Sequence, residues 1–376
     1  MMNLAEGLAT AGAALTQLMV ETPGHPFPAQ VPDNYPFVHH RVFLDTNIRV
    51  SGAALNLLQS GSYHLERFKK VALMKALEQI LAKENFDIIQ AEGPFVLGFL
   101  AELRSMTKAR IILRAHNVEY LIWERVAKSG RHGLLSPYLK LQSARLKREE
   151  IAIASQVDGL VVMSDTDLQA FKKLGVQTPA TVIGIGTSLK APEILPEQTE
   201  GRKIFHLGAM NWYPNKEGVE WFIEKVFPRV KAEVPGIKLH LAGHGMPAGI
   251  VPAEHQEAIQ LDSAPDAATY MLSHGIMIVP LLSGSGIRVK IIEGLRLGKV
   301  ILTTKIGAEG LGVADGRELL IASDEVEFAE KLIQCFADPA LCGEISENAR
   351  KFAAAHFDTA QLARQLLSFY KSLSIV

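Results

Sequence analysis

The 376-residue chain lacks the features that would place it in several broad classes of protein. Its two cysteines, Cys335 and Cys342, cannot build a disulfide framework, which favours a reducing compartment. A formal net charge of −1 gives no sign of the basic surface that nucleic-acid binding requires. No apolar run approaches the ~20 residues of a membrane span. The N-terminus lacks the order of basic, apolar and small residues found in a signal peptide. These absences predict a cytoplasmic protein without a nucleic-acid partner.

What is present is typical of a globular protein long enough for two domains. Hydrophobic residues make up 48% of the chain and charged residues 21%. Residues 190–201 are rich in proline and acids and show no periodicity, so they mark a linker. The predicted domains are 1–190 and 202–357, followed by a C-terminal helix at 358–376. The helices before and within that last segment are expected at 344–354 and 359–373.

Strand-like and helical runs alternate from end to end, which predicts an α/β protein with parallel sheets. In the first domain, strands are expected at 14–20, 86–90, 110–114, 159–163 and 180–183. In the second, they are expected at 203–207, 238–242, 258–261, 275–279 and 300–303. The start of the chain is typical of the first helix of a Rossmann-like domain, yet no strand precedes it. Either the protein begins further upstream or it lacks that strand.

Ligands of open parallel sheets bind at the carboxyl ends of strands, and the chain places polar residues and glycines there. In the first domain these are Glu92, His116 and Ser164, with Gly184 and Gly186 after the last strand. In the second domain they are Gly208, Gly243, Gly245, Ser263, Gly284, Ser285, Gly286, Thr304 and Glu309. We therefore expect each domain to contribute to a ligand site.

The segment from residue 280 to 310 is the most informative part of the chain. An apolar strand stops at Gly284 and Gly286, and a helical pattern follows at once. Such a loop points backbone N–H groups and a helix N-terminus at an anion such as a diphosphate. Lys290 and Glu293 share one face of that helix at i and i+3, and Arg288 points about 100° away from either of its chain neighbours. The alternative for Lys290 and Glu293 is an exposed ion pair, and Arg288 could equally be solvated.

His116 follows an apolar strand and precedes a helix that contains Trp123. An imidazole there can donate to or accept from a sugar hydroxyl or an acceptor near neutral pH. The alternative is a histidine that bridges the loop, with Asn117 as the N-cap of the helix.

The segment 280–310 resembles the donor-binding segment of the retaining glycosyltransferases called group 1 or family 4, which have the GT-B fold. Their hallmark is two glutamates separated by seven residues. The second falls on Glu293, which the resemblance places on the donor ribose, whereas Ser285 stands at the first. A sub-group with a glycine-rich loop, a lysine and a single glutamate, followed by Gly-Ala-Glu-Gly-Leu, is similar to this chain. It implies that Lys290 binds the donor diphosphate.

The resemblance implies further roles. His116 would contact the donor sugar. Gly208 would lie in the first strand-to-helix loop of the donor domain. Many members have an arginine next to this glycine, where Ala209 stands here. Lys216 is a candidate for the diphosphate, the alternative being a solvated helix lysine. The loop at Ser263 would lie against the base, or Asp266 would simply cap the next helix. The remaining residues expected to bind the donor are Arg288, Thr304 and Glu309. Those expected on the acceptor side are Glu92 and Asn117. The last helix would cross back to the first domain.

The predicted function is that of a retaining glycosyltransferase. It would move a hexosyl group from a nucleotide diphosphate sugar, UDP or GDP-linked, to a hydroxyl of a saccharide, lipid-linked or small-molecule acceptor. Cell-surface polysaccharide or glycoconjugate synthesis is the expected setting, and no cofactor or metal is expected. Two alternatives stay open: an inactive nucleotide-sugar-binding partner subunit, favoured by Ser285 and Ala209, and a sugar-nucleotide epimerase or hydrolase of the same fold.

The stretch from Lys128 to Arg148 collects basic residues with leucines between them. Such a face could lie on an anionic membrane surface if the acceptor is lipid-linked, although a solvated charged helix is commoner.

Overall fold

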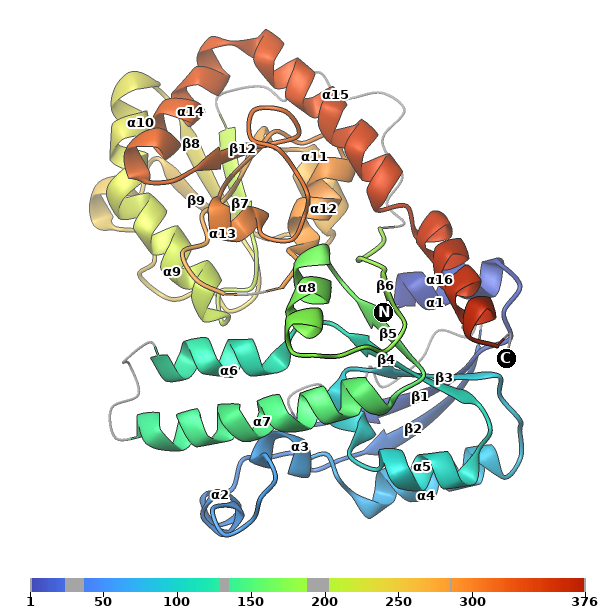
Figure 1. Ribbon diagram of the computed structural model, residues 1–376. Coiled ribbons are helices and arrows are strands. Elements are labelled where there is room, and N and C mark those ends of the chain that lie inside the picture. The colour runs from blue at the N-terminus through green and yellow to red at the C-terminus, as the bar shows by residue number, and fades with distance from the viewer. Residues whose placement is uncertain (1, 24–36, 129–134, 188–202, 285, 375–376) are drawn as a thin grey trace. The chain divides into compact units, whose positions relative to one another are not determined.

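The computed structural model describes residues 2–23, 37–128, 135–187, 203–284 and 286–374 (Figure 1). The chain divides into two compact units. Unit 1 comprises Met1–Gly184 with Ala360–Val376, and unit 2 comprises Ile185–Thr359. The sequence-based boundaries at 190, 202 and 358 stay a prediction. In the described residues, no helix combines the length and the apolar character needed to cross a bilayer.

Unit 1 contains two parallel sheets. Strands β1 (Thr16–Glu21) and β2 (Val38–Phe43) form one, and β3 (Ile88–Glu92), β4 (Arg110–Ala115), β5 (Gly159–Val162) and β6 (Ala180–Val182) form the other in that order. The helices are α1 (Met2–Thr10), α2 (Val50–Asn56), α3 (Tyr63–Glu66), α4 (Val71–Leu81), η1 (Pro94–Leu97), α5 (Leu100–Met106), α6 (Glu119–Lys128), α7 (Ser136–Gln156), α8 (Asp165–Lys173) and α16 (Thr359–Ser374).

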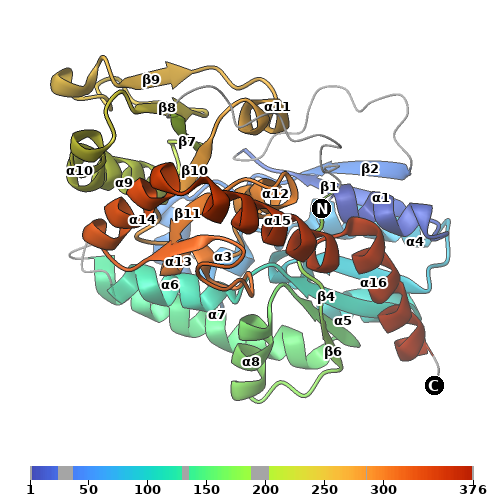
Figure 2. The same ribbon diagram turned by 90° about the horizontal axis from the view of Figure 1, so that it is seen from above.

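The C-terminal helix α16 belongs to the core of unit 1, beside α1 (Figures 1 and 2). Leu366 is fully buried in a cluster with Leu4 of α1, Ile112 of β4 and Val161 of β5. The helix lies so close to the sheet that a Cβ on Gly159 would come within 2.6 Å of Leu373. Residues from the two ends of the chain therefore cover one face of the same sheet.

Unit 2 is a doubly wound sheet of six parallel strands. Its strands are β7 (Lys203–Leu207), β8 (Lys238–Ala242), β9 (Ile259–Asp262), β10 (Ile276–Val279), β11 (Ile301–Thr304) and β12 (Leu320–Ala322). Their order is β12-β11-β10-β7-β8-β9, and Figure 2 shows β9, β8, β7, β10 and β11 following one another across the sheet. The strand order reverses between β7 and β10, and ligands of such sheets bind at this switch point.

Helices cover both faces of the sheet of unit 2, and two apolar clusters fill the layers. The helices are α9 (Tyr213–Trp221), η3 (Phe222–Val226), α10 (Phe227–Glu233), η4 (Ala253–His255), α11 (Ala267–Leu272), α12 (Val289–Arg296), α13 (Lys305–Ala308), α14 (Glu325–Ala337) and α15 (Pro339–His356). One cluster includes Phe222, Phe227 and Phe328; the other lies around Ile291 and Leu295 of α12. Strands buried on both faces are continuous apolar runs, as the sequence shows.

All ten strands expected from the sequence are present, with ends shifted by no more than two residues. The sequence analysis missed β2 and β12. Strand β2 carries His39, His40 and Arg41 and is largely exposed, so it has no apolar pattern. Strand β12 has only three residues. The expected helix at 344–354 is longer in the structure, because Pro339 begins α15 and Asp338 caps it by accepting from the Leu341 amide.

Candidate nucleotide site

A pocket of 410 Å³ lies in unit 2 at the switch point of the sheet, between the loop after β7 and the start of α12. Four residues predicted for the donor site line it: Gly208, Arg288, Lys290 and Glu293. The sequence analysis did not single out the other lining residues as site residues. They are Leu207, Ala209, Trp212, Asn215, Ala267, Met271, Ile287 and Val289. The wall thus combines two cations, one carboxylate and an apolar surface.

Lys290 is held by neutral groups. Its Nζ donates to Asn215 Oδ1 at 2.9 Å and lies 3.5 Å from His206 Nε2. His206 Nδ1 lies 3.0 Å from the carbonyl oxygen of Ile278, which can only accept, so Nδ1 carries the hydrogen and Nε2 is left to accept from Lys290. In the described residues Lys290 forms no ion pair, so the alternative of an exposed pair with Glu293 is wrong.

The electrostatics of the pocket favour an incoming anion. Burial, and after it the charge of Arg288, lowers the pKa of Lys290 to about 7. Burial, with the Lys290 charge second, holds the pKa of His206 well below its usual value. Burial also raises the pKa of Glu293. A lysine that is short of negative partners can gain interaction energy from a phosphate.

Arg288 is buried rather than solvated. Only 5% of the residue is exposed, and its guanidinium lies 5.9 Å from the ring centroid of Trp212. The same guanidinium donates to the carbonyl oxygen of Gly286. Gly284 and Gly286 have φ angles of 111° and 82°, which L side chains rarely adopt. The loop is fixed from outside because Ser283 Oγ donates to Glu217 of α9 at 2.6 Å.

Two glycines allow the loops of the pocket to meet. A Cβ on Gly208 would lie 2.5 Å from Lys290 Nζ, and one on Gly243 would lie 1.9 Å from the Gly208 carbonyl oxygen. Gly245 approaches Asn211 in the same way, at 3.2 Å. Gly243 and Gly245 therefore support the loop of Gly208 from behind and do not line the pocket.

Beside Gly243 and Gly245, six described residues predicted for the donor site do not line this pocket: Lys216, Ser263, Gly284, Gly286, Thr304 and Glu309. Lys216 is a helix lysine with 42% of its side chain exposed, 3.7 Å from Glu220. Ser263 is exposed after β9, where Asp266 caps α11 by accepting from the Thr269 amide. Thr304 is buried, caps α13 and donates to the Leu281 carbonyl. Glu309 follows α13. Ser285 lies outside the described residues.

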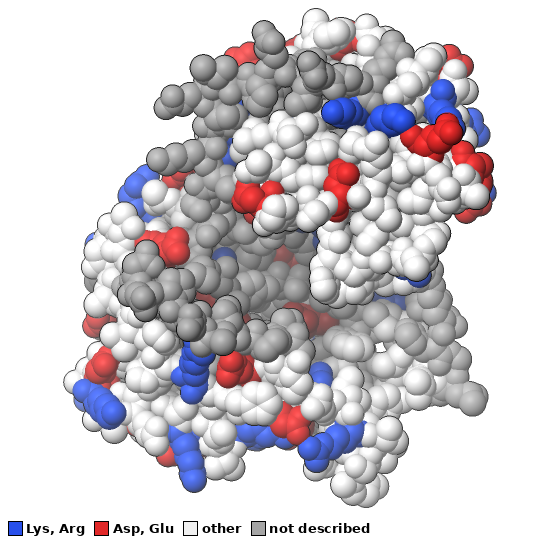
Figure 3. All heavy atoms as spheres, turned by 180° about the vertical axis from the view of Figure 1, so that it is seen from behind, with Lys and Arg blue, Asp and Glu red and all other residues white. Residues whose placement is uncertain are grey.

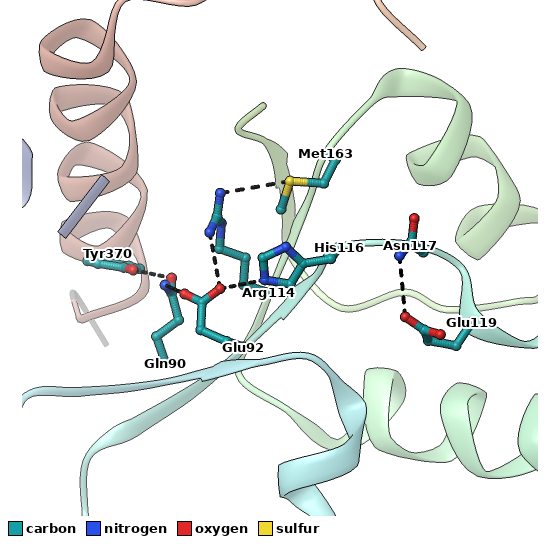
Figure 4. A network of polar contacts seen from close by, with 8 residues as sticks. All are labelled: Gln90, Glu92, Arg114, His116, Asn117, Glu119, Met163 and Tyr370. Atoms are coloured by element: carbon teal, nitrogen blue, oxygen red, sulfur yellow. Dashed lines mark hydrogen bonds and ion pairs between the residues drawn. The ribbon is translucent and has the colours of Figure 1, made fainter. Parts of the chain in front are cut away.

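A second group of side chains lies in unit 1 at the ends of β3 and β4 (Figure 4). His116 Nε2 is 2.6 Å from Glu92 Oε2, and Arg114 Nη1 donates to the same oxygen at 3.1 Å. Gln90 donates to Glu92 at 2.7 Å and accepts from Tyr370 of α16. Burial acts to raise the pKa of Glu92, but the bond to His116 and the Arg114 charge outweigh it and lower the pKa to about 2.

The carboxylate of Glu92 therefore orients the His116 ring. If Nε2–H faces Glu92, Nδ1 is the nitrogen available for another partner. The interpretation of Asn117 as an N-cap is wrong, because its amide nitrogen lies 3.4 Å from Glu119 Oε1 as a donor. Glu150 of α7 caps α6 instead, accepting from the Glu119 and Tyr120 amides at 2.8 and 3.0 Å.

The residues that position Lys290 were missed by sequence reasoning. Asn215 was not singled out, and His206 is one position of the strand expected at 203–207. The only signal available was a histidine inside that strand, flanked by Phe205 and Leu207.

A further polar group lies at the edge of the sheet in unit 2. His240, Asp262 and His274 place three atoms of metal-binding type within 4.8 Å of one another. Asp262 Oδ2 is 2.8 Å from His240 Nδ1 and 2.9 Å from the Tyr270 hydroxyl. These bonds connect β8, β9 and α11.

The fold defines the class: a two-domain α/β protein with parallel sheets, with a pocket lined by Arg288, Lys290 and Glu293 at the switch point of the second sheet. Its fold matches glycosyltransferases of the GT-B type. Sucrose-phosphate synthase from Thermosynechococcus elongatus superposes with a TM-score of 0.71 at 17% identity, covering 98% of this chain and 91% of that one. HepE from Anabaena, solved with UDP and glucose, gives 0.64 at 13% identity over 95% and 100%.

The sequence families agree with the fold. Residues 1–190 match the model of "Glycosyltransferase Family 4", and residues 201–338 match that of "Glycosyl transferases group 1". The chain therefore belongs to this glycosyltransferase family. A curated relative is an uncharacterized 44.6 kDa protein in the cps region of Klebsiella pneumoniae, 26% identical over 301 residues, which are 76% of this chain and 74% of the relative.

Proposed function

We propose that this glycosyltransferase moves a hexosyl group from a nucleotide diphosphate sugar to a hydroxyl acceptor with retention of configuration. The observation that carries the proposal is Lys290, a buried lysine held by Asn215 and His206 in the switch-point pocket. A cation with only neutral partners is suited to binding a diphosphate, because the diphosphate supplies the negative charge that no protein group supplies.

The pocket would act chiefly on the leaving group. Negative charge grows on the diphosphate as the sugar departs, and Lys290, the loop amides around Gly284 and Gly286, and the N-terminus of α12 would stabilise it. Arg288, close enough to Lys290 to lower its pKa, would add a second positive charge. Glu293, one turn into α12, would bind the ribose hydroxyls. Such a site needs no metal.

In the acceptor-side unit, His116 would orient the sugar through the ring nitrogen that Glu92 leaves available. Glu92 itself is a poor general base, because its bonds to His116 and Arg114 hold its pKa near 2. In the retaining reaction proposed here, the acceptor proton would instead leave to the donor phosphate on the same face of the sugar.

The donor and the setting are inferred from similar proteins. HepE is described in complex with UDP and glucose, which supports a UDP-sugar donor, with a GDP-sugar as the other candidate. The relative encoded in a cps region supports synthesis of a cell-surface polysaccharide. We propose that the acceptor is a saccharide or lipid-linked saccharide and that the enzyme works in the cytoplasm at the inner membrane face.

Thermal unfolding with UDP, GDP, ADP and TDP, alone and as sugar conjugates, tests the donor site. A ligand at 100 times its dissociation constant adds about 2.7 kcal/mol of stability, which is visible as a melting shift. The shift should appear for one nucleotide, vanish in Lys290→Met and persist in Lys231→Met, which removes an exposed lysine of α10. No shift with any nucleotide would contradict the proposal.

An inactive nucleotide-sugar-binding subunit is the second candidate, favoured by Ala209 and Ser285 at positions where the family resemblance implies an arginine and a glutamate. It predicts the same melting shift without turnover. Release of UDP or GDP from the stabilising sugar nucleotide, measured with and without saccharide acceptors, separates the two. Nucleotide release that requires an acceptor supports the transferase.

A further inference from the structure

The segment from Ile48 to Leu58, which contains α2 and is called the apolar tip below, exposes an unusual set of side chains. Ile48, Val50, Leu55, Leu57 and Leu58 are between 48% and 89% exposed. Figure 1 shows α2 projecting from the rest of unit 1. Single exposed apolar residues are ordinary, but a contiguous group of this kind marks an interaction site.

The helix of the tip buries its polar side and exposes its apolar side. The buried residue of α2 is Asn56, at 1% exposure, whereas its leucine and valine face solvent. Asn56 Oδ1 accepts from Gln142 at 2.8 Å, and Asn56 Nδ2 donates to the Gly61 carbonyl oxygen at 3.2 Å. Polar bonds, rather than apolar packing, therefore attach the tip to α7. Its apolar surface is left for another partner.

Basic residues of α7 form the base of the tip. Arg145 donates to the carbonyl oxygens of Asn56 and Leu57 at 2.7 and 3.2 Å, and Arg148 donates to that of Ser60. Lys140 and Leu141 are exposed on α7, one turn before Arg145. In Figure 3 the tip, at the lower right, is almost free of charge, with blue side chains beside it.

Asp45 and Glu149 have partners at this surface, and Glu66 lies beside Glu149, where its charge, after burial, raises the pKa of Glu149. Asp45 lies 2.6 Å from Arg49, whose side chain is 70% exposed, and Glu149 accepts from the Ser62 amide at 2.8 Å. The surface thus offers uncovered apolar side chains at its end and cations around its base. That order complements the surface of an anionic bilayer, where acyl chains lie beneath negative headgroups.

We propose that the apolar tip inserts into the headgroup layer of an anionic membrane, with Arg49, Lys140 and Arg148 facing lipid phosphates. The sequence pattern made residues 128–148 a candidate for membrane contact. In the structure the inserting side chains come from 48–58, and α7 supplies cations and support. The inference concerns unit 1 and does not depend on the nucleotide pocket of unit 2.

Co-sedimentation of the full chain with vesicles tests it. Binding is expected to vesicles of phosphatidylglycerol and phosphatidylcholine in equal parts, and little to phosphatidylcholine alone. Val50→Ser combined with Leu58→Ser should weaken the partition coefficient about tenfold or more. The matched control is Val71→Ser with Val326→Ser, which are 67% and 41% exposed elsewhere and should leave binding unchanged. Equal binding by both double variants would overturn the proposal.

A probe on the tip gives a second, independent readout. Cys335 and Cys342 are buried, at 4% and 6% exposure, so Leu58→Cys can be labelled selectively with an environment-sensitive dye. Anionic vesicles should shift its emission to the blue. An unchanged emission would contradict insertion. A wild-type dimer that Val50→Ser with Leu58→Ser converts to a monomer, without vesicle binding, would assign the tip to self-association instead. The nucleotide-induced melting shift should survive in every tip variant.

Discussion

At the scale of single residues, the protonation of Lys290 should control nucleotide binding. The pKa of Lys290 is lowered to about 7 in the empty pocket, and a bound diphosphate would raise it toward the ordinary 10.5. Between these values, the complex binds a proton that the free protein lacks. Affinity should therefore be full below pH 7 and fall as pH rises above it, by at most about tenfold per unit.

Isothermal titration in two buffers of different ionisation enthalpy measures this proton uptake directly. At pH 8 close to one proton should enter per nucleotide bound. Residual binding by Lys290→Met should show neither the uptake nor the pH slope. Tight binding with no proton uptake would mean that another group holds the diphosphate, even if the transferase function stands.

Gly243 offers a second test at this scale, because its role is steric. An alanine there would place Cβ 1.9 Å from the Gly208 carbonyl oxygen, so the loop behind the pocket must move. Gly243→Ala should lose nucleotide binding and cost more than the roughly 1 kcal/mol of a strained φ alone. Gly249 also has a positive φ, 82°, with nothing within 4 Å of its Cβ position, so Gly249→Ala is the control for backbone strain. Equal melting temperatures for the two variants would show that the contact is unimportant.

At the scale of elements, the N-terminus of α6 depends on one buried carboxylate. Burial raises the pKa of Glu150 to about 7, although its bonds to the Tyr120 and Glu119 amides act in the opposite direction. The folded pKa therefore lies above the ordinary 4.5, and the associated stability is present below pH 4.5 and lost as pH rises through 7.

Denaturant unfolding of the wild type should show this loss between pH 5 and pH 8. The contribution is at most about 3 kcal/mol, from 1.36 kcal/mol per pKa unit. Glu150→Gln should remove this part of the pH dependence, whereas Glu102→Gln, an exposed change in α5, should retain it. A wild-type profile that is unchanged in Glu150→Gln would refute the assignment.

The helices and strands also show which structural features the sequence could predict and which it could not. Strand positions follow from short apolar runs, and the start of α12 follows from the glycines before it, so both could be predicted. The exposure of the apolar side of α2 could not be predicted, because its leucine and valine suggest burial. Only the bonds between Asn56 and α7 show that its polar side faces inward.

At the scale of the whole molecule, the two compact units should respond separately to change. Leu366 of α16 is fully buried against the sheet of unit 1, nearly two hundred residues after that sheet ends. Leu366→Ala should cost about 2–5 kcal/mol, as large-to-small core changes do. Calorimetry should show this as a lower melting temperature for unit 1, with the nucleotide-induced shift preserved in unit 2.

Gln365→Ala, one position earlier on the exposed side of α16, is the matched control and should change little. If Leu366→Ala and Gln365→Ala melted alike, α16 would contribute nothing to the core of unit 1.

The sequence by itself determined the alternation of strands and helices, the glycine loop before α12 and the presence of Lys290 and Glu293 on it. These signals are local, because periodicity and positive φ are decided within a few residues. The tertiary structure alone decided that β7 lies beside β10, which brings His206 and Asn215 to Lys290 across 84 and 75 positions. The tertiary structure alone also brings Arg145 to the apolar tip, where it bonds to Asn56 and Leu57, 89 and 88 positions earlier in the chain. Such pairings depend on strand order and packing, which no local pattern of residues records.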